Sequence, residues 1–145
     1  MNAKAKEEIL QILNQIFKEE MAGIIRYMHY SFMIMGHNRI PIQSWFRAQA
    51  NESMQHAILI GEKITSYGGH PTLEAAQIPE THTHEIDKIL EESVIFEKKA
   101  LEMYKDLSLL AQKHEDIALE ELARQMLREE TDHVDEVAKM LRSHQ

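Results

Sequence analysis

Five side chains in this sequence have the types and spacing that can bind a transition-metal ion. Glu130-Thr-Asp-His133 places a carboxylate and an imidazole at positions i and i+3, on one face of a helix, where both can reach one ion. The other three candidates are Glu20, His56 and Glu97. Carboxylates offset the charge of cations, and imidazole adds a neutral nitrogen that suits iron. Because the chain has no cysteine, these are the strong ligands available to it.

An internal repeat links the candidates. A shift of 77 positions places four polar residues of the first half on identical residues of the second: Glu20 on Glu97, Tyr27 on Tyr104, Glu52 on Glu129 and His56 on His133. Apolar matches at the same shift are weaker evidence, since any two amphipathic helix pairs share them. We interpret the repeat as a pseudo-twofold relation between two helix hairpins.

Ser53 breaks the repeat. A two-metal site in a helix bundle takes one Glu from each of two helices and a Glu-x-x-His unit from each of the others. The residue three before His56 is Ser53, at the position that corresponds to Glu130. A short neutral serine cannot bridge two ions as a carboxylate does. Three outcomes stay open: Glu52 swings in as a ligand, the second metal is weakly held or replaced by water, or the site binds one metal.

Four amphipathic segments are expected to position these residues. Apolar residues recur at helical spacing over residues 4–35, 41–68, 83–112 and 116–142. Two of the links are short, which predicts antiparallel neighbours. The middle link, residues 70–82, reaches about 40 Å when extended, which matches the length of a 27-residue helix. The sequence therefore predicts an all-α four-helix bundle of two antiparallel hairpins joined by a long crossover.

Composition narrows the class of protein. A chain of 145 residues suits one domain, which we place at 1–145. The formal net charge of −8 and the lack of a basic tail argue against a nucleic-acid partner. No apolar stretch approaches the roughly 18 residues of a membrane span. Because no secretory signal is evident, the predicted location is the cytoplasm and no membrane partner is expected.

The motifs resemble those of bacterioferritin, within the ferritin-like di-iron family, over nearly the whole chain. The segments that carry the resemblance are Leu13-Asn-Gln-Ile-Phe-Lys-Glu-Glu20 with Arg26-Tyr27, Glu52-Ser-Met-Gln-His56-Ala57, Gly69-His-Pro71-Thr-Leu73 and Glu129-Glu130-Thr-Asp-His133. The resemblance implies a ferritin-like four-helix bundle and a di-iron ferroxidase centre with the ligands Glu20, His56, Glu97, Glu130 and His133. It implies no catalytic residue beyond these ligands, and it makes Tyr27 a neighbour of the centre. The implied activity is oxidation of Fe(II) by oxygen or peroxide, followed by iron storage.

The chain departs from that family in two places. Ser53 stands where the family has a bridging glutamate, so we expect one or two irons per chain and slower ferroxidase chemistry. The sequence also ends just after the fourth segment, without the fifth helix of large ferritin shells. We expect a homo-oligomer, and the choice between a dimer, a 12-mer and a 24-mer stays open. Met54 matches the haem-ligating methionine of bacterioferritin, although a helical methionine is more often a packing residue, so haem is the lesser expectation.

Three other classes of function are alternatives to a ferroxidase. Ser53 motivates a non-catalytic descendant that keeps the bundle as an oligomeric scaffold or metal-binding module. A mini-ferritin that protects DNA fits less well, since such proteins build the iron site between subunits. The absence of cysteine counts against a rubrerythrin-like peroxidase with a rubredoxin-type iron centre. The ligands alone do not choose among iron, manganese and zinc.

Overall fold

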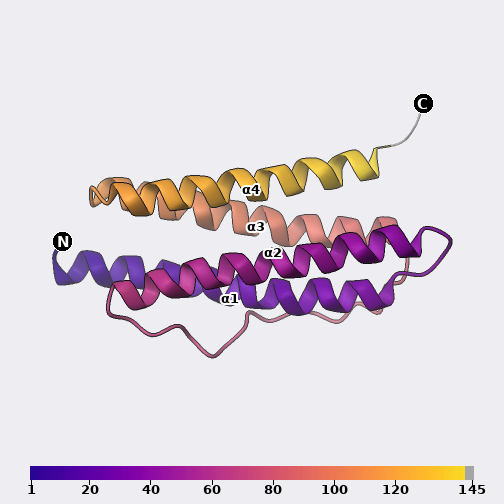
Figure 1. Ribbon diagram of the computed structural model, residues 1–145, viewed down its shortest axis with the longest axis horizontal. Helices are drawn as coiled ribbons and strands as arrows, with labels where there is room; N and C mark the ends of the chain where they lie inside the picture. Colours follow the sequence, from indigo (N-terminus) through magenta and orange to yellow (C-terminus); the bar gives the residue numbers. More distant parts are fainter. Residues whose placement is uncertain (143–145) are drawn as a thin grey trace. The chain divides into compact units, whose positions relative to one another are not determined.

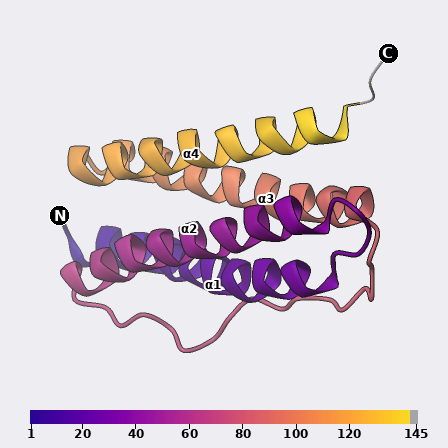
Figure 2. The same ribbon diagram turned by 45° about the vertical axis from the view of Figure 1, so that its right-hand side comes forward.

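The computed structural model describes residues 1–142 and is all-helical in its regular structure (Figure 1). Its four helices are α1 (Ala3–Met33), α2 (Arg39–Ser66), α3 (Ile86–Lys113) and α4 (Ile117–Leu141). The predicted fold of two antiparallel hairpins is confirmed, with α1 paired to α2 and α3 paired to α4 (Figures 1 and 2). Within residues 1–142, no helix combines the length and apolarity needed to cross a membrane.

Local capping sets several helix boundaries. The Asn2 Oδ1 accepts a hydrogen bond from the Ala5 amide at 2.8 Å, at the start of α1. Asp116 caps α4 by accepting from the Leu119 amide at 3.1 Å. α3 begins at Ile86, three residues later than expected. The reason is a turn in which His82 has φ 54°, outside the helical region, and donates its amide to Glu80 Oε1 at 2.7 Å.

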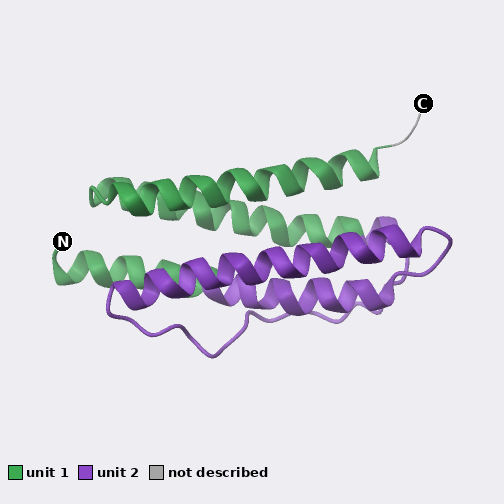
Figure 3. Cartoon of the chain, in the orientation of Figure 1, with its two compact units in different colours: residues 1–16, 90–145 green, residues 17–89 purple. Residues whose placement is uncertain are grey.

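The chain divides into two compact units (Figure 3). Unit 1 comprises residues 1–16 and 90–145, and unit 2 comprises residues 17–89. The border at residues 16 and 17 falls inside α1, so this helix contributes to both units. That residues 1–145 form a single domain stays a prediction.

Unit 2 is built from the C-terminal part of α1, from α2 and from the crossover. The ring of Phe46 is fully buried and stacks on Tyr27, with 5.9 Å between the centroids. Gly23 lets the two helices approach closely, because a Cβ built at this position would lie 2.8 Å from Ser53 Oγ. These contacts fix the α1–α2 hairpin around the helix faces that carry Glu20 and His56.

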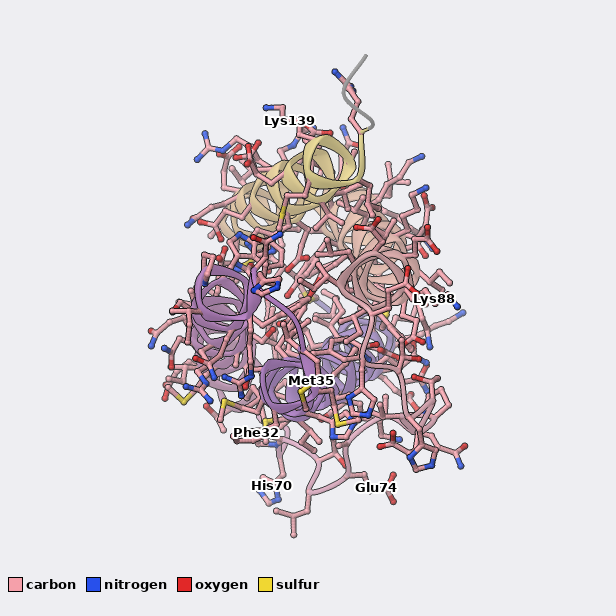
Figure 4. The ribbon with its side chains drawn as sticks, turned by 90° about the vertical axis from the view of Figure 1, so that its right-hand side faces the viewer. Phe32, Met35, His70, Glu74, Lys88 and Lys139 are labelled. Carbon is pink, nitrogen blue, oxygen red and sulfur yellow. The ribbon has the colours of Figure 1, made fainter. Side chains whose placement is uncertain are left out.

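The crossover, residues 67–85, runs along α1 in the direction of that helix (Figures 1 and 2). Its contacts follow in order: the Ala76 amide donates to the Lys18 carbonyl at 3.1 Å, Glu80 Oε2 lies 2.9 Å from His29 Nε2, and His84 Nδ1 lies 2.9 Å from the Met33 carbonyl. Figure 4 shows His70 and Glu74 on this link. The link was predicted to be long enough to run beside a helix, and it does so along the part of α1 that belongs to unit 2.

Unit 1 packs the α3–α4 hairpin with the first turns of α1. Its core consists of fully or almost fully buried apolar side chains: Ile9, Leu13, Leu90, Tyr104, Leu107, Ala111, Leu119, Ala123, Met126 and Val137. At the α3–α4 turn, His114 Nε2 lies 3.3 Å from Glu8 Oε2 of α1. This hydrogen bond, with Lys113 nearby, lowers the pKa of Glu8.

Candidate metal centre

Unit 1 contains a buried carboxylate–imidazole cluster. Glu97 of α3 and Glu130 and His133 of α4 each offer a ligand atom, and these atoms lie within 4.8 Å of one another. Glu130 is 3% exposed and Glu97 is 7% exposed. Two carboxylates brought this close and out of water repel each other unless a proton or a cation lies between them. The arrangement therefore suits a positive ion.

Helical periodicity explains why these polar residues face inward. On α4 the buried residues include Ala123, Met126, Glu130 and Val137, so Glu130 continues an apolar stripe. His133 lies one turn further on the same face, with its Nδ1 4.0 Å from Glu130 Oε2. On α3 Glu97 lies four residues after the buried Ser93, which places it on the buried stripe of that helix.

Unit 2 contains a second cluster around His56. The Nδ1 atom of His56 lies 3.6 Å from Glu20 Oε1, and its Nε2 atom lies 3.7 Å from Glu52 Oε1. His56 is 2% exposed and Glu20 is 4% exposed, whereas the Glu52 side chain is 34% exposed. Glu20 follows the buried Ile16 by one turn of α1 and so continues the buried stripe of that helix.

Ser53 lies in the same cluster as a small buried residue. It is 7% exposed and one turn before His56, with its side chain against the backbone of Gly23. In unit 1 the corresponding residue is the carboxylate Glu130. The two clusters therefore share the sequence repeat but differ in charge at this one position.

The donor atoms fit iron and related ions. Carboxylate oxygens with one imidazole nitrogen per cluster match the preferences of Fe(II), Mn(II) and Zn(II). Each cluster lies on helices whose neighbouring buried positions are mostly apolar. The structure thus brings Glu97 together with Glu130 and His133, and Glu20 together with His56. Their role as metal ligands stays a prediction.

Two residues near Ser53 were not identified from the sequence. Gln49 lies one turn before Ser53, is 7% exposed, and has an Oε1 atom with no hydrogen-bond partner among residues 1–142. Its burial on the polar side of α2 has no simple periodic signal, because the apolar pattern of that helix is weak. Gly23 was also missed, since only the contact with Ser53 explains a glycine in mid-helix.

Known proteins with the same fold share this arrangement of helices. A ferritin-like diiron-carboxylate protein from Bacillus anthracis str. Ames has 23% identity and a TM-score of 0.91, covering 98% of this chain and 100% of that one. The bacterioferritin of Desulfovibrio desulfuricans has 21% identity and a TM-score of 0.88, covering 95% and 80%. A DPS protein from Vibrio cholerae O1 has 17% identity and a TM-score of 0.92, covering 98% and 94%. At these identities the likeness shows the fold.

The family assignment comes from the sequence. A search of curated protein sequences found no match. The family model described as the ferritin-like domain matches residues 10–144, which is most of the chain. Together with the two buried Glu/His clusters, this match agrees with the resemblance inferred from the motifs. The chain belongs to the ferritin family and carries its ferritin-like domain.

Proposed function

We propose that this protein binds Fe(II) at its two carboxylate–imidazole clusters and oxidises it with oxygen or peroxide, which serves iron storage or detoxification. The observation that carries the proposal is the pair of buried clusters related by the repeat of 77 positions. Fe(II) is the substrate, and each ion gives up one electron to the oxidant and becomes Fe(III). The protein's part is to collect the ions and hold them in a protected core.

Each residue has a role in this proposal. Glu20 and Glu97 serve as terminal ligands, Glu130 is a further carboxylate ligand beside His133, and His56 and His133 each hold one metal. Ser53 adds no charge, so we expect the position near His56 to hold its ion less tightly than the position near His133. The number of ions is therefore one or two per chain, and the oxidation is slower than with a glutamate at position 53.

An anaerobic Fe(II) titration followed by exposure to air tests the function. We expect saturable binding of one or two ions per chain and oxidation faster than in buffer. His133→Ala should lower both the binding and the rate. A useful control is His37→Ala, which removes an exposed imidazole in the α1–α2 turn. The proposal fails if the wild-type chain neither saturates with iron nor exceeds the buffer rate.

A second candidate function is a non-catalytic scaffold that keeps a degraded site, and Ser53 is the observation that favours it. Ser53→Glu separates the two candidates, because it restores the carboxylate that the repeat has at position 130. A large gain in the oxidation rate over a slow wild type would mean that the natural site is impaired. If Ser53→Glu oxidises Fe(II) at the wild-type rate, the wild-type rate itself decides. A wild-type rate above that of buffer means that catalysis is already present, and a rate equal to that of buffer means that it is absent.

We also propose a homo-oligomer, with the outer face of the α1–α2 hairpin as its contact surface. Large apolar side chains of unit 2 are exposed there: Ile25, Met28, Phe32, Met54 and Ile58. Figure 4 shows Phe32 at the outside of the α1–α2 hairpin. An apolar groove of 410 Å³ lies between the two helices and is lined in part by Phe17, Ile24 and Met54. Patches of this kind commonly mark interfaces.

A cytoplasmic location and the absence of haem and of nucleic-acid partners stay predictions.

A further inference from the structure

The imidazole of His56 lies between two carboxylates that approach it from different sides. Glu20 Oε1 is 3.6 Å from Nδ1, and Glu52 Oε1 is 3.7 Å from Nε2. The two ring nitrogens direct their bonds away from each other. A metal ion on Nδ1 would therefore lie on the side of Glu20, while Nε2 would keep its hydrogen and point toward Glu52.

This geometry separates two roles for Glu52. As a substitute for the glutamate missing at position 53, its carboxylate would have to reach the ion on the Nδ1 side of the ring. Glu52 instead lies four residues before His56 on α2, beside Nε2. A metal-bound histidine commonly donates its second N–H to a carboxylate, which orients the ring and makes the other nitrogen a better ligand.

We propose that Glu52 is a positioning residue that accepts a hydrogen bond from Nε2–H of His56 and so directs Nδ1 toward the metal. The inference rests on the proposed function, because it takes His56 as a ligand. The present 3.7 Å separation is longer than a hydrogen bond. The Glu52 side chain is 34% exposed, so it has room for the small rotation that closes this gap when an ion binds.

Binding of Zn²⁺, which is redox-inert, tests the role on the full chain by titration calorimetry. We expect Glu52→Ala to keep the number of ions per chain and to weaken binding by about 10- to 100-fold. Glu52→Gln should recover part of the affinity, because its amide oxygen still accepts a hydrogen bond. Glu62→Ala removes the same charge from α2 away from the ring and should change nothing. A lower number of ions in Glu52→Ala, or an unchanged affinity, would overturn the proposal.

The ring proton of His56 gives a second measurement that does not need iron. Nitrogen-15 NMR of the imidazole distinguishes the Nε2–H from the Nδ1–H form. In the Zn²⁺-loaded wild type we expect Nε2–H. In the metal-free neutral ring, Glu52→Ala should shift the population toward Nδ1–H, on the side of Glu20, and Glu62→Ala should not.

The two measurements keep the inference separate from the proposed function. A wild type that binds no iron rejects the function, while the ring proton still reports on Glu52. If the wild type binds iron and Glu52→Ala leaves the His56 ring proton on the same nitrogen, only the positioning role is rejected. Thermal unfolding of each variant checks that the chain has folded.

Discussion

At the scale of single residues, helical spacing was the physical basis for grouping polar side chains from the sequence. Glu130 and His133 were identified because the i, i+3 spacing places them on one helix face, and the structure has them in one cluster with Glu97. The surroundings of Ser53 were not predictable. They depend on a contact with Gly23, 30 positions away, and a single sequence has no signal for such a contact.

Glu130→Gln should reduce the stabilisation that metal gives to the fold. An ion that binds only the folded state raises stability by about 2.7 kcal/mol at a concentration 100 times its Kd. Without the Glu130 carboxylate, we expect most of that increment to disappear, because the cluster loses a charged ligand. Thermal unfolding with and without Zn²⁺ measures it. Glu136→Gln, an exposed substitution on the same helix, is the control. An equal Zn²⁺ increment in wild type and Glu130→Gln would contradict the role of Glu130.

Gly23 and Ser53 should be energetically coupled. A methyl group at position 23 would meet Ser53 Oγ at 2.8 Å, so Gly23→Ala crowds the hairpin even though alanine is the better helix former. In a Ser53→Ala background the crowding disappears, and Gly23→Ala should then stabilise by about 1 kcal/mol. Denaturant unfolding of the two single variants and the double variant gives the coupling, which we expect near 1 kcal/mol. A coupling energy of zero would mean that the Ser53 hydroxyl rotates away from the added methyl group without loss of stability.

At the scale of elements, the crossover shows what link length can and cannot predict. Its length indicated that it could run along a helix, and it does run beside α1. Its individual contacts were not foreseen, since they join residues with no shared periodicity. The late start of α3 has the same origin: the turn at His82 depends on a hydrogen bond to Glu80, and helix propensity does not report it.

The contact that Glu80 makes between the crossover and α1 should weaken at low pH. The His82 amide bond to its carboxylate, helped by His29, lowers the pKa of Glu80 below the usual glutamate value. A lowered carboxyl pKa adds stability at pH values above the unfolded-state pKa, and that stability is lost as pH falls through the folded-state value.

Urea unfolding of wild type and Glu80→Gln at a series of pH values measures this effect. The wild type should be the more stable protein near neutrality, and the two should converge below the folded-state pKa of Glu80. Glu85→Gln, which removes a carboxylate from the same segment, is the matched control variant. A Glu80→Gln difference that is constant from pH 7 to pH 3 would contradict the prediction.

At the scale of the whole molecule, the repeat predicted the two hairpins, because helix pairs of similar length and pattern fold alike. The exposed apolar residues of α1 were not identified as a surface beforehand. Helical periodicity distinguishes an apolar face from a polar one, but it does not tell whether an apolar residue at the edge of that face is covered within its own chain.

Charges on this surface should reduce the size of the assembly. Ile25 and Phe32 are 53% and 55% exposed, on one face of α1. We expect Ile25→Lys combined with Phe32→Lys to lower the mass measured by light scattering. Burying the two lysines in an interface would remove their charges from water and bring like charges together, and both effects are unfavourable. Ile117→Lys, at a 72% exposed position in unit 1, should leave the mass unchanged. An unaltered mass for the double variant would place the contacts elsewhere.

The border between the two compact units lies at residues 16 and 17, in the middle of the 31-residue helix α1. Natural and engineered excision of fragments works best in exposed loops, where no backbone hydrogen bonds are lost. Here no cut in a loop separates the units, because each of them needs its own part of one continuous helix. Neither unit is therefore expected to survive as an independently expressed piece, and a protease that nicks the chain within α1 would damage both at once.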